Sequence, residues 1–318
     1  MKIVSLDGEA LNPGDLSWDC FRQFGEITVY PRTATAEEVI ERLQGVDIVL
    51  LNKVPLTDEI MAACPDLKLI CVLATGYNVV DCAAAARRGI PVCNVPAYST
   101  NAVAQFTFAL LLELCNRVGH HNDAVHGGRW SSCPNFCFWD TPQMELAGKT
   151  MGIIGFGRIG QAVGRIARAF GMEVLAYNRS RCPECEAIAA YTDLDDLLRR
   201  SDVVSLHLPL TAENTGMVNE AFLSKMKDGA ILLNTARGGL INEAALNRAL
   251  ASGKLRGAAA DVATVEPIPA DSPLLTAPNM ILTPHMAWAP LETRQRILDI
   301  TMDSIHGWLA GTPKNQVN

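Results

Sequence analysis

Three side chains that could carry chemistry each follow a short apolar run: Arg237 in "LLNTARGG", Glu266 in "AADVATVEP" and His285 in "ILTPHMAW". A histidine beside a carboxylate can take up and return a proton near neutral pH. An arginine can hold a carboxylate through two parallel hydrogen bonds. Each residue alone could be a surface ion or a turn residue. If the apolar runs are parallel strands, however, their carboxyl ends share the sheet edge where ligands bind, which makes the three candidate catalytic residues.

A glycine pattern in residues 152–160, "GIIGFGRIG", lies upstream of these residues. It joins an apolar run to a helical pattern rich in small residues. Gly155 permits a tight turn, Gly157 lets the backbone approach a pyrophosphate, and Gly160 allows the helix to pack closely on the strand. The N–H groups at the start of the helix would face the phosphates. In this context the pattern predicts a dinucleotide site.

The end of the next expected strand, "VLAYNRSRC", bears on the choice of cofactor. An acidic residue usually binds the ribose 2′-OH of NAD at this place, whereas this chain has Asn178. The neighbouring Arg179 and Ser180 could bind a 2′-phosphate, which favours NADP over NAD. The alternative is that they are ordinary loop residues and that Asn178 serves the ribose of NAD.

Short β-rich runs alternate with helical patterns along the chain, which is typical of parallel sheets covered on both faces. The first block predicts strands at 2–7, 27–31, 47–52, 67–75 and 92–95, with helices at 36–45 and 81–89. A long helix follows, from Asn101 to about Gly119. The second block predicts strands at 149–155, 173–178, 203–209, 230–235, 257–262 and 280–283, and helices at 158–170, 194–200, 219–226, 241–252 and 291–311.

Nearly half of the chain precedes the glycine pattern. We therefore predict an α/β protein of two doubly wound parallel-sheet domains, with a Rossmann nucleotide domain inserted into a flavodoxin-like substrate domain. The substrate domain would comprise residues 1–100 and 286–318, and the dinucleotide-binding domain residues 101–285.

Composition limits the binding partners, the cellular locations and the metal sites that the sequence allows. The net charge is −7 with both signs interspersed, which argues against partners such as nucleic acid or an anionic membrane. No signal peptide or membrane span is evident, so a cytoplasmic protein is expected. Two cysteine pairs, Cys133/Cys137 and Cys182/Cys185, could be imagined as a zinc site. Because the pairs lie far apart in the sequence, we expect reduced thiols and no metal.

The motifs together resemble those of the D-isomer-specific 2-hydroxyacid dehydrogenases over essentially the whole chain. The matching stretches are "VLATGYN", "GFGRIGQAVGRIARAFGMEVLAY", "SLHLPLTAENTGMVN", "LLNTARGGLINEAAL", "AADVATVEP" and "LTPHMAW". Two more, "LDGEALNPGDLSW" and "FCFWD", resemble the glycerate dehydrogenase/hydroxypyruvate reductase branch. The resemblance implies reversible hydride transfer between a nicotinamide cofactor and a small D-2-hydroxy acid/2-oxo acid pair, such as glycerate/hydroxypyruvate or glycolate/glyoxylate.

The resemblance also implies roles for single residues. Arg237 would bind the substrate carboxylate, His285 would donate the proton and Glu266 would hold the imidazole. The backbone amides of Thr75, Gly76 and Tyr77 would complete the carboxylate site. On the cofactor side, the resemblance implies Arg158 and Ile159 at the pyrophosphate with Thr107 above it, His207, Pro209 and Thr215 along the adenosine half, Thr235 and Ala236 beside the nicotinamide, and Asp261 at its carboxamide.

Assembly and the alternative function follow from the same resemblance. The family is usually dimeric through the nucleotide domain, so a homodimer with residues 120–145 at the interface is implied. Some relatives act instead as NAD-sensing corepressors, which can keep the Arg–Glu–His set. This chain lacks the long disordered tails that would recruit partners, so an enzyme is favoured.

Overall fold

The computed structural model describes all residues from Met1 to Asn318. They form two compact units: unit 1 comprises Met1–Ser99 and Trp288–Asn318, and unit 2 comprises Thr100–Ala287. Each unit has its own parallel sheet. The sequence placed the two borders at residues 100/101 and 285/286. No helix combines the length and the apolar character that crossing a bilayer requires.

Unit 1 is built on a five-stranded parallel sheet in the order β2-β1-β3-β4-β5. This is the flavodoxin-like order, as the sequence predicted. The strands are β1 (Lys2–Ser5), β2 (Glu26–Val29), β3 (Ile48–Leu51), β4 (Leu69–Val72) and β5 (Val92–Cys93). Every residue of β3 and β4 is buried, which explains why these strands read as uninterrupted apolar runs.

Helices from both ends of the chain cover the sheet of unit 1. They are α1 (Gly8–Leu11), α2 (Ala36–Arg42), α3 (Asp58–Ala62), α4 (Cys82–Arg87) and α11 (Leu291–Leu309). Ile297 and Ile305 of α11 are fully buried in one cluster with Ile3 and Leu69. The C-terminal helix therefore belongs to the core of unit 1, and the polypeptide of unit 2 is inserted between two segments of this unit.

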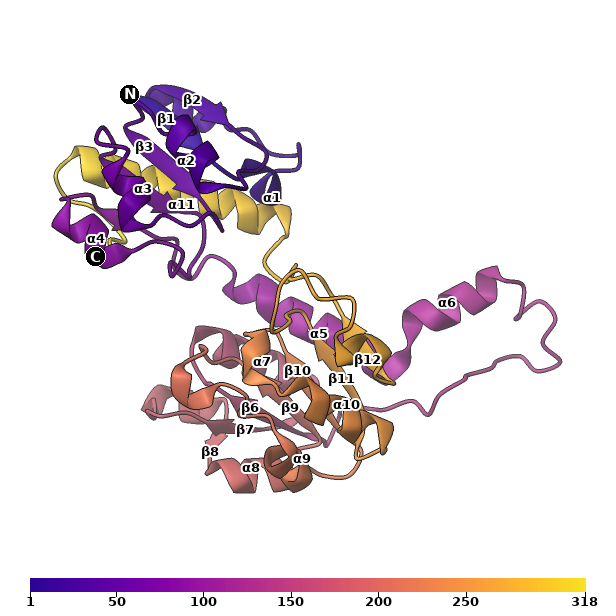
Figure 1. Cartoon of the computed structure of the whole chain (residues 1–318). Coiled ribbons are helices and arrows are strands. Elements are labelled where there is room, and N and C mark those ends of the chain that lie inside the picture. The colour runs from indigo at the N-terminus through magenta and orange to yellow at the C-terminus, as the bar shows by residue number, and fades with distance from the viewer. The chain divides into compact units, whose positions relative to one another are not determined.

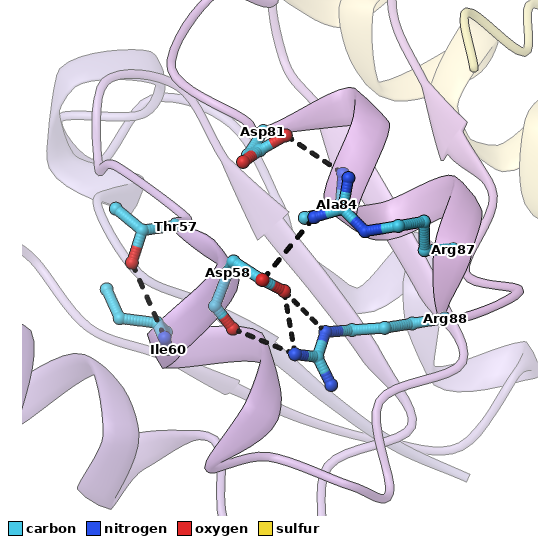
Figure 2. A network of polar contacts seen from close by, with 7 residues as sticks. All are labelled: Thr57, Asp58, Ile60, Asp81, Ala84, Arg87 and Arg88. Carbon is cyan, nitrogen blue, oxygen red and sulfur yellow. Dashed lines mark hydrogen bonds and ion pairs between the residues drawn. The ribbon is translucent and has the colours of Figure 1, made fainter.

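Polar contacts tie α3 to α4 on one side of the unit 1 sheet (Figure 2). Thr57 and Asp81 cap the two helices, and each side chain accepts a backbone N–H from three residues further on. Nη2 of Arg88 donates to the Asp58 carboxylate at 2.7 Å, and Nη2 of Arg87 donates to it at 3.4 Å. The hydrogen bond from Arg88 is the main reason that the pKa of Asp58 lies below its usual value. These contacts join the start of α3 to the end of α4.

Unit 2 is built on a seven-stranded parallel sheet in the order β12-β11-β10-β9-β6-β7-β8. The strands are β6 (Thr150–Ile154), β7 (Glu173–Tyr177), β8 (Ala190–Tyr191), β9 (Val203–Leu206), β10 (Ala230–Asn234), β11 (Leu255–Ala260) and β12 (Met280–Leu282). Counted from β6, this is the Rossmann strand order with one further strand at an edge, which confirms the predicted fold. The order reverses between β6 and β9, and the carboxyl ends of these two strands form the switch point at which ligands bind.

Helices cover both faces of this sheet (Figure 1). One apolar core contains Ile153 of β6 with residues of α5 (Thr100–Asn116) and α7 (Arg158–Ala169). The neighbouring Ile154 points into the second core, which contains residues of α8 (Leu194–Arg200), α9 (Glu220–Lys225) and α10 (Glu243–Ala251). Short 3-10 helices complete the chain at Asp19–Gln23, Pro183–Ala187, Ala212–Asn214, Gly238–Leu240 and Pro273–Thr276.

The long helix expected to reach about Gly119 ends earlier. Arg117 adopts a left-handed backbone conformation with φ of 51°, so α5 stops at Asn116 and α6 (Val118–His126) starts in a new direction. Residues 118–145, which we call the arm, extend away from the sheet of unit 2 (Figure 1). The Asp140 carboxylate joins distant parts of the arm, since it lies 2.6 Å from Nε2 of His120 and 2.5 Å from Nη1 of Arg129. No residue of α6 is buried.

Candidate active site

The glycine turn after β6 has room for a ligand. Gly155 has φ of 91°, and a Cβ there would overlap the carbonyl group of His207. A Cβ on Gly160 would overlap the Gly155 carbonyl oxygen, whereas a Cβ on Gly157 would meet nothing within 4 Å. Gly155 and Gly160 are thus required by the packing of the chain itself. The open space lies at Gly157, directly before α7.

The start of α7 presents hydrogen-bond donors at this open space. Gly157 is the N-cap residue and offers no side chain to the first turn. The backbone N–H groups of Arg158, Ile159 and Gly160 therefore have no partner within the helix, and the helix dipole favours an anion there. A diphosphate group fits this combination of donors and space. These residues could hold the phosphates of a dinucleotide.

The loop after β7 is tied to the glycine turn by Asn178. Its Oδ1 accepts the backbone N–H of Phe156 at 3.2 Å, and its Nδ2 donates to the carbonyl oxygen of Ser180 at 2.8 Å. Both halves of the amide therefore bond to the protein, a role that the sequence did not suggest. The side chains of Arg179 and Ser180 are exposed.

His207 follows β9, on the other side of the switch point. Its backbone N–H donates to the carbonyl oxygen of Ile154 at 2.8 Å, and its Nε2 shares a 2.8 Å hydrogen bond with the Ser205 hydroxyl. Burial lowers the pKa of His207 to about 3. The ring is therefore neutral at physiological pH and acts as a hydrogen-bonding group. Further along the same segment, the Pro209 carbonyl accepts from Asn214 and the Thr215 hydroxyl donates to Thr211.

Two hydroxyls join α5 to the end of β10. Thr107 is fully buried, and its Oγ1 lies 3.1 Å from Oγ1 of Thr235. The Thr107 hydroxyl also donates to the carbonyl oxygen of Val103 at 2.8 Å. This pair fixes the position of the turn that follows β10, which carries Thr235, Ala236 and Arg237.

Asn234 shapes that turn, and sequence reasoning missed it. The residue is fully buried, its Oδ1 accepts the N–H of Ala236 at 3.0 Å, and its Nδ2 donates to the carbonyl oxygen of Arg237 at 2.9 Å. The Arg237 side chain is exposed and forms no ion pair, so its charge is available to an anion. A polar residue at the end of the buried run "AILLN" was the available signal.

Glu266 and His285 meet as the sequence suggested. Nδ1 of His285 lies 2.6 Å from Oε2 of Glu266, and Oε1 of Glu266 accepts the N–H of Ala263 at 3.2 Å. Because a carboxylate only accepts, Nδ1 carries the hydrogen. The two side chains are 31% and 35% exposed, so the pair is accessible to a small molecule.

Asp261 holds the loop that carries His285. It is 1% exposed, and its Oδ1 accepts the Thr283 hydroxyl at 2.6 Å and the N–H of Met286 at 2.9 Å. Its Oδ2 accepts the N–H of Ala287 at 2.8 Å. His285 itself has φ of 53°, in the left-handed region that few non-glycine residues adopt, although His does so more often than most. The carboxylate that the resemblance assigns to a nicotinamide carboxamide thus also supports the left-handed turn at His285.

The turn of Arg237 packs on the loop of Glu266. A Cβ on Gly238 would overlap the carbonyl group of Ala263, so the two backbones lie in direct contact. Arg237, Glu266 and His285 follow β10, β11 and β12, which are neighbours in the sheet. The structure therefore collects all three candidates at one sheet edge, and it joins Glu266 to His285 directly.

Residues 75–77 of unit 1 follow β4. The Thr75 hydroxyl donates to the carbonyl oxygen of Val95 at 2.9 Å, and Nδ2 of Asn94 donates to the carbonyl oxygen of Thr75 at 2.8 Å. The backbone N–H groups of Thr75, Gly76 and Tyr77 make no hydrogen bond to the protein. This exposed turn therefore presents three adjacent donors.

All ten cysteines are free thiols. No three His, Cys, Asp or Glu side chains come together in a way that could hold a metal ion. Sγ of Cys182 instead donates to Oε2 of Glu184 at 3.1 Å.

Comparison with known proteins agrees with this geometry. Residues 108–287 match the family model described as "D-isomer specific 2-hydroxyacid dehydrogenase, NAD binding domain". The chain is 53% identical to a hydroxypyruvate reductase from Blautia hydrogenotrophica over the full length of both proteins. It is 41% identical to a glycerate dehydrogenase from Methylorubrum extorquens, over 99% of this chain and 98% of the relative.

Solved structures with bound cofactors share the fold over the full length of both chains. An acyclic imino acid reductase in complex with NADPH and D-Arg is 32% identical, with a TM-score of 0.84. A D-isomer specific 2-hydroxyacid dehydrogenase from Lactobacillus delbrueckii ssp. bulgaricus in its NAD-complexed form is 27% identical, with a TM-score of 0.81. Similar chains thus bind either nicotinamide cofactor.

Proposed function

Because the chain belongs to the D-isomer specific 2-hydroxyacid dehydrogenase family, we propose that it interconverts hydroxypyruvate and D-glycerate, with glyoxylate and glycolate as a second substrate pair. The observation that carries this proposal is the 2.6 Å contact between His285 and Glu266, in the loops that follow two strands of the Rossmann-type sheet. The identity with a hydroxypyruvate reductase supports the choice of substrate. A corepressor role is not favoured, since the similar relatives are named as enzymes.

The residues divide the chemistry among them. The reduced nicotinamide supplies the hydride. Arg237 binds the substrate carboxylate through its guanidinium. His285 delivers a proton to the C2 oxygen of the 2-oxo acid, and Glu266 orients the imidazole and balances its charge when protonated. The free backbone N–H groups of residues 75–77 support a second contact to the carboxylate.

For the two units we propose separate roles. Unit 2, with the glycine turn and the switch point, is the dinucleotide-binding domain, and unit 1 is the substrate domain. On the cofactor, Thr107, Thr235 and Ala236 adjoin the nicotinamide side, and the segment with His207, Pro209 and Thr215 adjoins the adenosine side. The absence of an acidic residue at position 178 and the exposed Arg179 support NADP over NAD.

We also propose a homodimer that forms through the arm. Five large apolar side chains of the arm are exposed to solvent: Val118, Val125, Trp130, Phe136 and Trp139. Phe136 is 89% exposed, and large exposed apolar patches mark sites of interaction. The ten free thiols suit a reducing compartment, which supports a cytoplasmic location.

A substrate screen tests the proposed function. The purified protein is given glyoxylate, hydroxypyruvate, pyruvate and a bulkier 2-oxo acid, each with NADH and with NADPH, and the loss of reduced nicotinamide is followed. We expect the highest kcat/KM with hydroxypyruvate, glyoxylate next, and D-glycerate as the product of the former. A preference for pyruvate or the bulkier acid would contradict the proposed substrate, and L-glycerate would contradict the proposed stereochemistry.

A further inference from the structure

The loop between β11 and β12 has little apolar support of its own. Most residues from Thr264 to Asp271 are exposed, including Val265 at 57%. An open pocket of about 440 Å³ borders the loop and is lined in part by Glu243, Val265 and Ser272. Yet the loop carries Glu266, whose carboxylate must lie within hydrogen-bonding distance of His285. Something other than a hydrophobic core must hold it.

Glu243 supplies the polar contacts that do so. Its Oε1 accepts the backbone N–H of Thr264 at 3.0 Å, and its Oε2 accepts the Ser272 hydroxyl at 2.8 Å. One carboxylate thus accepts hydrogen bonds from the loop on both sides of Glu266. Apart from the contact between Glu266 and His285 and the bonds by which Ser272 caps the 3-10 helix that follows it, these are the only hydrogen bonds that join residues 263–272 to another element.

The position of Glu243 suits this task. It is the first residue of α10, directly after the N-cap residue Asn242, whose Oδ1 accepts the N–H of Ala245. The helix start fixes its backbone, and the positive end of the helix dipole favours its charge. Partial burial opposes that charge, but the hydrogen bonds from Thr264 and Ser272 hold the pKa of Glu243 below its usual value. The group is therefore a fixed anion at physiological pH.

We propose that Glu243 is a positioning residue: its carboxylate clamps the two ends of the Glu266 loop and so keeps Glu266 against His285. The expected loss of rate rests on the proposed function. The expected loosening of the loop does not depend on it. Small displacements of a catalytic group cost much activity. Loss of the clamp therefore lowers the rate without removing any group that touches substrate or cofactor.

Kinetics of three variants test the proposal. We expect Glu243→Ala to lower kcat by roughly 10- to 100-fold, with little change in the affinity for cofactor. Glu243→Gln should recover much of the rate, since its amide can still accept from Thr264 and donate to the Ser272 hydroxyl. The matched control is Glu220→Ala, which removes the equivalent first-turn carboxylate of α9, an exposed partner of Arg248.

A readout without turnover separates this proposal from the proposed function. Hydrogen exchange of the Thr264 amide, which donates to Glu243, and of the Ala263 and Ser272 amides should quicken in Glu243→Ala, keep the wild-type rate in the Glu220→Ala control and be partly restored in Glu243→Gln. If the wild type turns over no 2-oxo acid but this exchange pattern holds, the clamp stands and the proposed function fails. If Glu243→Ala keeps the wild-type exchange rates and kcat, the clamp is refuted whatever the substrate.

Discussion

Nδ1 of His285 lies 2.6 Å from Oε2 of Glu266, and the two residues come from the loops that follow neighbouring strands. The carboxylate orders the ring and fixes the hydrogen on Nδ1, which leaves proton transfer to Nε2. The pair thus sets the geometry of the proposed proton transfer.

Glu266→Gln should test the role of the carboxylate charge. The amide can still lie beside the ring, but it carries no charge to balance the ring when it is protonated. At neutral pH we expect kcat to fall by about 10- to 100-fold. Asp271→Asn is the matched control, because it removes an exposed carboxylate from the same loop. A Glu266→Gln kcat equal to that of the wild type would exclude the charge of Glu266 from the mechanism.

Arg179→Ala should test the choice of cofactor. A charge-assisted contact to a 2′-phosphate contributes about 1.5–3 kcal/mol, so kcat/KM for NADPH should fall by roughly 10- to 100-fold. NADH lacks this phosphate and should hardly respond. Arg181→Ala is the control within the same loop, since its guanidinium lies 5.8 Å from the centre of the Tyr191 ring. A wild type that prefers NADH, with Arg179→Ala affecting both cofactors equally, would overturn the preference for NADP.

Asn178→Asp should shift the cofactor preference in the same direction. A carboxylate can accept the ribose 2′-OH of NADH and repels a 2′-phosphate. It can also keep the bond from the N–H of Phe156, but it cannot donate to the Ser180 carbonyl as Asn178 does. We therefore expect a gain in the ratio of NADH to NADPH kcat/KM together with a small loss of stability. An unchanged ratio would count against any role of position 178 in cofactor choice.

His207 should make the stability of the protein fall in mild acid. Burial lowers its pKa to about 3 in the folded protein, whereas the unfolded chain takes up a proton at the ordinary histidine pKa of about 6.5. Protonation therefore favours the unfolded state as the pH drops below that value. Between pH 7 and pH 5 this one group should remove about 2 kcal/mol from the free energy of unfolding.

Urea denaturation of His207→Gln and wild type at the two pH values measures this effect. The drop in unfolding free energy between pH 7 and pH 5 should be smaller in the variant by that amount. His126→Gln, which changes an exposed histidine at the end of α6, is the control. Equal drops in the wild type and in His207→Gln would show that His207 is not held neutral by burial.

The arm should decide the oligomeric state. Replacing Trp130, Phe136 and Trp139 together by serine removes large exposed apolar side chains without touching any buried position. Sedimentation velocity should show a dimer for the wild type and a monomer for the triple variant. Leu309→Ser, which removes an exposed apolar side chain from α11, should stay dimeric. A monomeric wild type, or a dimeric triple variant, would refute the arm as the interface.

The fold was predictable because buried parallel strands leave a plain pattern in the sequence. Runs such as "IVLL" and "LICV" are apolar at every position, since helices cover both faces of the sheet. Shorter elements left no such pattern. Strand β8 has only two residues. Helix α1 has four residues and α3 has five, and both are too short to show a helical period in the sequence. The left-handed residue Arg117, which ends α5, is not a type that marks a helix end.

The candidate site was predictable only in part. Glycine spacing and polar residues after apolar runs indicated where the chemistry lies, because strand ends collect at one edge. The supporting contacts join residues that are distant in sequence: Asp261 to Ala287 across 26 residues, and Glu243 to Ser272 across 29. No local pattern encodes such pairs. The role of Asn178 was missed for the same reason, since its partner Phe156 belongs to the neighbouring strand–turn segment.

The central claim is that His285 is the acid–base group of a hydride transfer to a 2-oxo acid. Its most direct test is the kcat of His285→Ala and wild type in the reduction of hydroxypyruvate, with the cofactor dissociation constant measured on the same samples. We expect kcat to fall by about 100-fold or more, with cofactor affinity nearly unchanged. A His285→Ala variant that binds cofactor and turns over at close to the wild-type rate would contradict the account.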